Sequence, residues 1–596
     1  MKQTPSKPLR SNDRLLNRVT RLIFSALLFL FYRLVVDPRL VYDAQRPVFF
    51  YTGSFNKGYL AYPAGPIEWL SHFITQFYTS ATLGALLMTA AVLSLALSIR
   101  ALLRRFSRSD SSYGAEWLIV APIAALQADY LYPIQYTLSL ILIVFVFDCF
   151  NRLTAKSGTA GKTIGFFVMT VMLYFLMGAL ALALPFFLIL SVKSFKPAEL
   201  VGILMSLLIA AAVPQLLFQF KAADPSQLYT CALPLTFSLK QKLIYAGFWL
   251  LLFGAWLIIR IAAEDRPFGK MSILLPVTGL LTAGFSAYLL FQPQYKIVLR
   301  VNAYAEQRQW QRCLRLLDHH PDLNHRLTNL MRYRALYFTG QLGDRLFEHP
   351  HEGADGLYRS DKLSFEFPIA YCDLLIDLGN VNGALHKAYE AWAVEGETPR
   401  VLQRLAYLHL AKKQFPAAEK YLHMLAQTGK HRKWALLHRN VCQHQAPDGS
   451  ADLLRLSQFV ERADFLMRPG FAGAELKDIV GTQASRMAVE YLLSHNLLSG
   501  RLDLFMENLP LFMQITADLP RAFEEAVVLY LNSGLPVTEA QYAISIRPST
   551  VESFNRFMQI LQKHANDKYR ALLELQNTFH DSFWFYLLYL RSEEAQ

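Results

Sequence analysis

Apolar blocks alternate with short, mostly basic breaks from Thr20 to about Phe291. A helix that crosses a bilayer needs about 20 predominantly apolar residues, and several of the blocks approach that length. Nine blocks can be separated, at residues 22–36, 79–99, 116–128, 134–150, 163–177, 179–192, 199–218, 238–259 and 271–291. The sequence therefore predicts an all-α protein whose first half, residues 22–292, is a polytopic helical membrane domain of about nine spans.

Charge and span length both bear on the orientation of these spans. The basic N-terminus, residues 1–21, runs into the first block without a small-residue cleavage site, which indicates an uncleaved signal anchor with a cytoplasmic N-terminus. A single helix over 163–192 would be about 45 Å long against a hydrocarbon core of about 30 Å, so we expect two spans there. Nine spans place 18 of the 25 basic residues of 1–292 on the cytoplasmic side. The second half is accordingly expected outside the cytoplasmic (inner) membrane, in the periplasm.

The distribution of charge argues against a nucleic-acid partner. Residues 1–292 hold 25 Lys and Arg against 12 Asp and Glu, whereas residues 293–596 hold 34 of each. The net charge of +13 thus belongs to the membrane half, where basic loop residues set the orientation of the spans. We expect the lipid bilayer as a partner, and no DNA or RNA.

Residues 37–78 separate the first two blocks and are too many for a simple turn. Within them, Gly65 and Pro66 open a stretch with apolar residues at helical spacing. This pattern predicts a helix that lies along the outer membrane interface or, equally, one that packs on the helical bundle.

After residue 292 the chain reads as helix after helix. Two segments align at a 34-residue offset, with small residues at Ala384 and Ala418 and a small or apolar residue four positions later, at Ala388 and Leu422. This spacing is typical of tetratricopeptide-like hairpins, which stack into a solenoid with a concave, peptide-binding face. We expect such repeats over 293–445, and over 451–596 a helical region that caps or continues the solenoid.

Three segments carry a resemblance to a known family. They are YPAGPIEWLSHFITQFYTSATLGALL at 62–87, YRALYFTGQLGDRLF at 333–347 and RLAYLHLAKKQFPAAEKYLHMLAQTGKHRKWA at 404–435. They resemble an uncharacterised bacterial family of multispanning membrane proteins with a tetratricopeptide-like C-terminal half, classed only as a domain of unknown function. The resemblance covers nearly the whole chain and implies this architecture, but it brings no assigned activity. One departure is Ala64, where the family pattern has glycine.

Acidic residues in two expected external loops are the feature of the membrane half that most resembles an active site. Asp37 and Asp43 follow the first block, and Asp129 lies in the turn between the third and the fourth. This layout is similar to that of GT-C type glycosyltransferases, which use lipid-linked sugar donors. The resemblance implies that Asp43 or Asp37 deprotonates an acceptor hydroxyl, or that one of them binds a divalent metal, Mg or Mn, together with Asp129.

Three neighbouring residues would contact the substrate under this hypothesis. Arg46 and Lys57 could bind the phosphate of a lipid-linked sugar, and Tyr130 lies beside Asp129. The alternative is that these carboxylates are solvated loop or helix-capping residues. The protein would then be a non-catalytic, membrane-anchored scaffold whose solenoid binds a protein or peptide partner.

The remaining metal-binding residue types show no site. The five cysteines are widely spaced without a CxxC pair, and the clustered histidines of the second half lack the i,i+4 spacing with a glutamate that a zinc hydrolase needs. We expect the cysteines to be buried apolar side chains.

Overall fold

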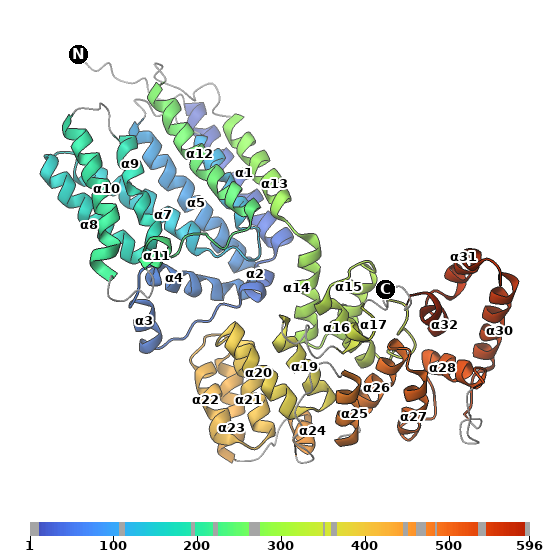
Figure 1. Ribbon diagram of the computed structural model, residues 1–596. Helices are drawn as coiled ribbons and strands as arrows, with labels where there is room; N and C mark the ends of the chain where they lie inside the picture. Colours follow the sequence, from blue (N-terminus) through green and yellow to red (C-terminus); the bar gives the residue numbers. More distant parts are fainter. Residues whose placement is uncertain are drawn as a thin grey trace. The chain divides into compact units, whose positions relative to one another are not determined.

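The computed structural model is helical throughout, with no strand in the residues that it describes (Figure 1). Close contacts divide the chain into two compact units, Met1–Pro293 and Gln294–Gln596. The division lies where the apolar blocks of the sequence end. The described residues are 11–106, 114–191, 197–218, 225–261, 274–349, 352–358, 366–444, 451–460, 472–482, 485–534 and 544–590.

The first unit is a bundle of long apolar helices with a group of shorter ones. Its α-helices are α1 (Ser11–Leu30), α2 (Pro38–Gln45), α3 (Gly53–Tyr59), α4 (Gly65–Thr75), α5 (Ala81–Phe106), α6 (Ala115–Leu126), α7 (Gln135–Leu153), α8 (Thr159–Met177), α9 (Leu184–Ser191), α10 (Pro197–Phe218), α11 (Pro225–Thr230), α12 (Leu239–Ile261) and α13 (Leu274–Leu290). Short π or 3-10 segments are η1 (Phe31–Val36), η2 (Gln76–Thr79) and η3 (Gly178–Ala183). The first ten residues of the predicted cytoplasmic N-terminus lie outside the described residues.

Several helices of this unit could cross a membrane. Five stretches are long and apolar enough: Val19–Val36, Ala81–Arg105, Gln135–Leu153, Ala160–Ile189 and Leu239–Ile259. A sixth is obtained if α13 and the following helix, α14 (Pro293–Glu306), are counted together. Helices α6 and α10 are apolar but offer shorter apolar stretches, Ala115–Leu126 and Leu200–Leu216. A multispanning unit is thus supported, whereas the count of nine is not confirmed.

The expected division of 163–192 into two spans is not confirmed. Here α8 leads through the 3-10 segment η3 into α9, and by length and composition the stretch Ala160–Ile189 counts as one candidate span. Gly178 makes the break with a φ of 74°, a backbone conformation that glycine adopts without strain. An apolar pattern alone does not separate one broken helix from two helices, because the residues are equally apolar in both cases.

Helix α6 lies at the centre of the first unit, and nearly all its side chains are buried. Its most extensive contact is with α13, where Gly279 lets the two backbones approach. A Cβ atom at Gly279 would lie 2.8 Å from the Trp117 carbonyl carbon. The buried Glu116 carboxylate of α6 lies 3.5 Å from the Arg100 guanidinium of α5 and accepts a hydrogen bond from the Gly114 amide. Paired in this way, the charge is tolerated in an apolar bundle.

The helix expected to begin at Gly65 is α4, and it has Pro66 in its first turn as the sequence indicates. It packs against α3, α7 and α8. Its buried face carries Ile67, Ser71 and Thr75. The helix therefore packs on the bundle, which is one of the two arrangements that the sequence allows.

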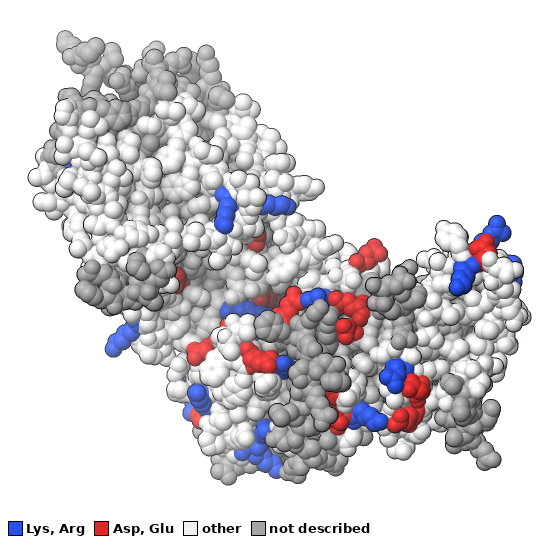
Figure 2. Space-filling model, in the orientation of Figure 1, with Lys and Arg blue, Asp and Glu red and all other residues white. Residues whose placement is uncertain are grey.

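The second unit consists of helices that pack mainly on their chain neighbours. They are α14 (Pro293–Glu306), α15 (Trp310–Asp318), α16 (Arg326–Phe338), α17 (Gly353–Leu357), α19 (Pro368–Leu378), α20 (Val381–Glu395), α21 (Pro399–Ala411), α22 (Phe415–Ala426), α23 (Arg432–His444), α24 (Ala451–Phe459), α25 (Ala472–Thr482), α26 (Arg486–Leu498), α27 (Leu502–Met513), α28 (Arg521–Leu531), α30 (Pro548–Lys563), α31 (Lys568–Phe579), α32 (Phe583–Phe585) and the π segment η5 (Tyr586–Leu590). Charged side chains of both signs lie on the face of this unit shown in Figure 2, whereas the first unit shows few.

Helices α19 to α23 form the part with the predicted repeats. Each packs on the next, and α20 and α22 begin 34 residues apart. The four small or apolar side chains at the aligned positions are fully buried: Ala384, Ala388, Ala418 and Leu422. These features fit the expected hairpins, and the assignment to the tetratricopeptide-like class stays a prediction.

The terminal aromatic run is buried. Trp584 packs between Phe554, Phe557 and Phe579, and its indole N–H donates to the Glu525 carbonyl oxygen at 2.8 Å. The segment thus anchors the end of the chain to α28, α30 and α31.

Candidate functional site

Asp37, one of the three predicted catalytic carboxylates, forms hydrogen bonds within its own segment, at the start of α2. It caps the N-terminus of α2, accepting a hydrogen bond from the Arg39 amide at 3.3 Å. The Arg39 guanidinium also donates to both carboxylate oxygens, at 2.9 and 2.7 Å. Asp37 is 95% buried and therefore matches the alternative interpretation as a capping residue.

Asp129, in the turn after α6, is also hydrogen bonded. Its Oδ1 accepts from the Leu131 amide at 2.9 Å, and its Oδ2 accepts from the side-chain amide of Gln241 at 2.8 Å. Burial raises the pKa of Asp129, and these two hydrogen bonds partly offset that effect. Both oxygens of the carboxylate thus have partners within the protein.

The structure brings the α2 segment and the Asp129 turn together. Gln45, at the end of α2, donates through Nε2 to the carbonyl oxygens of Tyr130 and Tyr132, at 3.1 and 2.9 Å. The Tyr130 hydroxyl donates to the Val36 carbonyl oxygen at 3.2 Å. Tyr130 is therefore buried between the two segments, where it holds them together.

The other predicted site residues lie on α2 and α3. Asp43 is a half-buried residue of α2, and Arg46 ends that helix in the left-handed conformation, with a φ of 47°. Lys57 is exposed on α3. Among the described residues, no group of three or more His, Cys, Asp or Glu side chains could hold a metal ion. The predicted roles in catalysis, phosphate binding and metal binding stay predictions.

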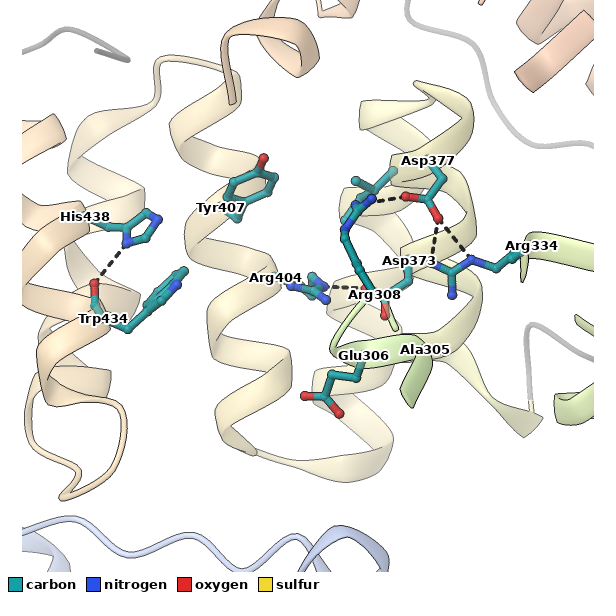
Figure 3. A pocket seen from close by; sticks show the side chains of 11 residues that line it. Ala305, Glu306, Arg308, Arg334, Asp373, Asp377, Arg404, Tyr407, Trp434 and His438 are labelled. Carbon is teal, nitrogen blue, oxygen red and sulfur yellow. Dashed lines mark hydrogen bonds and ion pairs between the residues drawn. The ribbon is translucent and has the colours of Figure 1, made fainter. Parts of the chain in front are cut away.

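The second unit contains an open pocket of about 270 Å³ (Figure 3). Its walls come from five helices and the turn after the first of them: α14, α16, α19, α21 and α23. Eleven residues line it: Ala305, Glu306, Arg308, Arg334, Asp373, Ile376, Asp377, Arg404, Tyr407, Trp434 and His438. Of these helices, α19 packs on α20 and α21 packs on α22, so each is the first member of an adjacent helix pair.

Two buried aspartates organise one wall of the pocket. Asp377 accepts hydrogen bonds from Arg308 Nη2 and from Arg334 Nε, each at 3.0 Å. Asp373, one turn earlier on α19, accepts from Arg400 at 2.6 Å and from Arg404. With Glu306, which lies 3.6 Å from Arg400, three carboxylates face four guanidinium groups, so the cluster carries one excess positive charge.

The electrostatics of this wall keep Asp373 ionised. Burial by itself raises the pKa of Asp373, but the Arg404 and Arg400 guanidinium groups outweigh burial and hold the pKa well below its usual range. In the contacts of the described residues, Arg308 donates to Asp377 through Nη2 alone, and Arg404 donates to Asp373 through Nε alone. Both guanidinium groups keep donors for a ligand.

The opposite wall is aromatic. The rings of Trp434 and His438 stack on α23 with centroids 3.9 Å apart, and Tyr407 lies on the adjacent α21 (Figure 3). Burial lowers the pKa of His438, so its ring is neutral at pH 7. A pocket with an aromatic wall and a few convergent polar groups is a usual form of a ligand site.

Comparison with known proteins gives one match. Residues 14–590 match the profile of a family described as a family of unknown function, DUF6057. The chain belongs to this family. No curated protein and no solved structure matches the sequence.

Sequence reasoning missed the pocket of this DUF6057 chain, although a signal was present. Asp373 and Asp377 are four residues apart on one helix, and Arg400 and Arg404 are four apart on another. Such spacing places each pair on one helix face. Only the packing of α19 against α21 could show that the faces meet.

Proposed function

We propose that this protein is a membrane-anchored recognition protein of the cell envelope. In this proposal, its first unit crosses the cytoplasmic membrane with about nine spans and holds the N-terminus in the cytoplasm. Its second unit is a tetratricopeptide-like solenoid on the periplasmic side that binds an extended segment of a protein partner.

The observation that carries the proposal is the pocket built by α14, α16, α19, α21 and α23. The Arg308 and Arg404 donors suit the carbonyl and carboxylate oxygens of a peptide, and the Trp434 ring offers an apolar contact for a side chain. The predicted catalytic residues Asp37 and Asp129 are held by their own neighbours, which favours binding over catalysis.

Photo-crosslinking in whole cells tests this function. We replace Tyr407 of the full chain with benzoylphenylalanine and expect a covalent adduct with a partner protein on irradiation. The same replacement of Val394, an exposed residue of α20 that does not line the pocket, is the matched control. Combining the Tyr407 probe with Trp434→Ala should abolish the adduct. Equal adducts from both probe positions would contradict the proposal.

A second candidate is a GT-C-like handler of a lipid-linked substrate. The hydrogen bonds of Gln45 to Tyr130 and Tyr132 favour it, because they tie the helix that carries Asp43 to the turn that carries Asp129. Under this candidate, Asp43→Asn abolishes complementation of a deletion strain while the protein still inserts at its normal level. Full complementation by the Asp37, Asp43 and Asp129 variants would remove it, together with the Mg or Mn site.

A further inference from the structure

Helix α4 of the first unit carries a carboxylate without a cationic partner. Glu68 is half buried, and its Oε2 accepts a hydrogen bond from the Tyr62 hydroxyl at 2.6 Å. Burial raises the pKa of Glu68, and the Tyr62 hydrogen bond offsets part of that effect. In the described part of the chain, no Lys or Arg forms an ion pair with it.

The ionisable groups that surround Glu68 cannot neutralise its charge. Tyr59, Tyr62, Tyr136 and Cys231 lie within its electrostatic reach, and each of them is an acid. The base on the same helix is His72, and burial lowers its pKa, so its ring is neutral at pH 7. A partly buried carboxylate is costly without a cation, and the structure supplies none in the residues described.

Two tyrosines lie next to this carboxylate: Tyr62 donates its hydrogen bond to it, and Tyr59 lies within its electrostatic reach. The Tyr59 ring lies 4.9 Å from Phe55 and 6.1 Å from Tyr62, measured between centroids. A carboxylate among aromatic faces is the arrangement that recognises ammonium groups, because the faces of the rings are negative.

Three irregular backbone segments meet beside Glu68. Ala64, at the start of α4, has a left-handed φ of 69°, and its amide donates to the Phe175 carbonyl oxygen at 3.0 Å. Where α8 breaks at Gly178, the next amide, that of Ala179, donates to the Cys231 carbonyl oxygen at 3.0 Å. In membrane proteins, non-helical backbone is tolerated where it is buried or lines a cavity, and broken helices frame ligand sites.

We propose that Glu68, with the rings of Tyr59 and Tyr62, forms a binding site for an ammonium group. The ammonium N–H groups donate to the carboxylate, and the rings cover the alkyl carbons beside the nitrogen. Such a group is present in an aminophospholipid head group and in a soluble amine, and the experiment distinguishes these sources. The site is separate from the pocket of the second unit and does not rest on its function.

Carbodiimide labelling of the full chain tests the site. Dicyclohexylcarbodiimide reacts with carboxyl groups that are protonated in apolar surroundings, and mass spectrometry of peptides locates the product. In nanodiscs of phosphatidylglycerol alone, we expect Glu68 to be labelled. Adding phosphatidylethanolamine should slow the labelling about tenfold if the ligand is a lipid, since an ammonium partner keeps the carboxylate ionised. Ethanolamine in solution should slow the labelling of Glu68 instead if the ligand is a soluble amine.

Two outcomes would overturn the site. One is a labelling rate of Glu68 that neither amine changes, and the other is no labelling in phosphatidylglycerol alone. Tyr59→Leu should weaken the protection without preventing the reaction. Tyr288→Leu, which changes an exposed tyrosine of α13, should leave the protection unchanged.

Glu68→Gln lacks the carboxyl group that the carbodiimide labels, so this variant is tested by its melting temperature. The protecting amine should raise the melting temperature of the wild-type chain but not that of Glu68→Gln, which keeps the size of the side chain and loses its charge. Equal melting temperatures in phosphatidylglycerol alone would show that the variant is folded. An equal rise for both proteins would count against the proposal.

Discussion

At the scale of single residues, the second unit depends on buried charges that have partners. The Asp377 side chain is fully buried and the Arg334 side chain is 96% buried. We expect Asp377→Ala to destabilise the unit by about 3–5 kcal/mol, because it leaves the Arg334 guanidinium buried without its anion. Thermal unfolding of the full chain measures this loss. Asp503→Ala, which breaks an exposed pair with Arg501, is the control and should cause no measurable change.

Glu490, a buried residue of α26, should make stability depend on pH. Burial raises its pKa to about 7, although Arg486 partly opposes the shift. The unfolded carboxyl titrates near 4.3, so the folded state binds more protons between about pH 4.3 and 7. Stability should therefore fall as the pH rises through this window and level off above it.

Glu490→Gln should remove that part of the pH dependence. The variant should exceed the wild type by up to about 3 kcal/mol at pH 8, and this difference should shrink at pH 5, where the wild-type carboxyl is largely neutral. Melting temperatures of both chains at the two pH values check the prediction. Glu507→Gln, a change at an exposed residue of α27, should leave the pH dependence of the melting temperature unchanged.

At the scale of helices, the contact of α6 with α13 depends on one missing side chain. Gly279→Ala would place a Cβ atom 2.8 Å from the Trp117 carbonyl carbon, so the helices would have to separate. We expect a loss of about 1–3 kcal/mol from this overpacking. Gly284→Ala on the same helix meets nothing within 4 Å and should be neutral or slightly stabilising. Equal melting temperatures for the two variants would contradict this account.

The sequence predicted the long apolar helices of the first unit because each has a local signal. The apolar block at 238–259 is α12, and the Gly65-Pro66 start belongs to α4. Helix breaks were less predictable, since the 3-10 segment η3 is as apolar as the helices beside it. The predicted carboxylates were found by their position between spans, but position in the sequence does not show that Asp37 pairs with Arg39.

At the scale of the whole molecule, the number of spans fixes the side of each loop. Lys156 follows α7, which is the third of the five candidate spans. With five spans Lys156 would lie in the periplasm, whereas with nine it would lie in the cytoplasm. Glu397 in the second unit would lie in the periplasm with five spans and also with nine. We expect an impermeant maleimide to label Glu397→Cys from the periplasm, and Lys156→Cys only after the membrane is permeabilised. Labelling of Lys156→Cys from the periplasm would favour five spans.

The pocket of the second unit was beyond sequence reasoning for a physical reason. Its lining runs from Ala305 to His438 and comes from helices that are distant in the chain. The sequence pattern of no single helix marks the pocket, which exists only because of how the helices pack against one another. The repeat at Ala384 and Ala418 indicated the stacking, but it gave no information about the residues on the inner face.

The contact of α6 with α13 has a consequence for biosynthesis. Helix α6 is too short to be counted as a span by itself, and it carries the charged Glu116 near its start. Its principal partner, α13, is the last helix of the unit to leave the ribosome. During synthesis α6 is therefore made before that partner, while the helices between them are still to be inserted, and an insertase or chaperone would stabilise it until α13 follows.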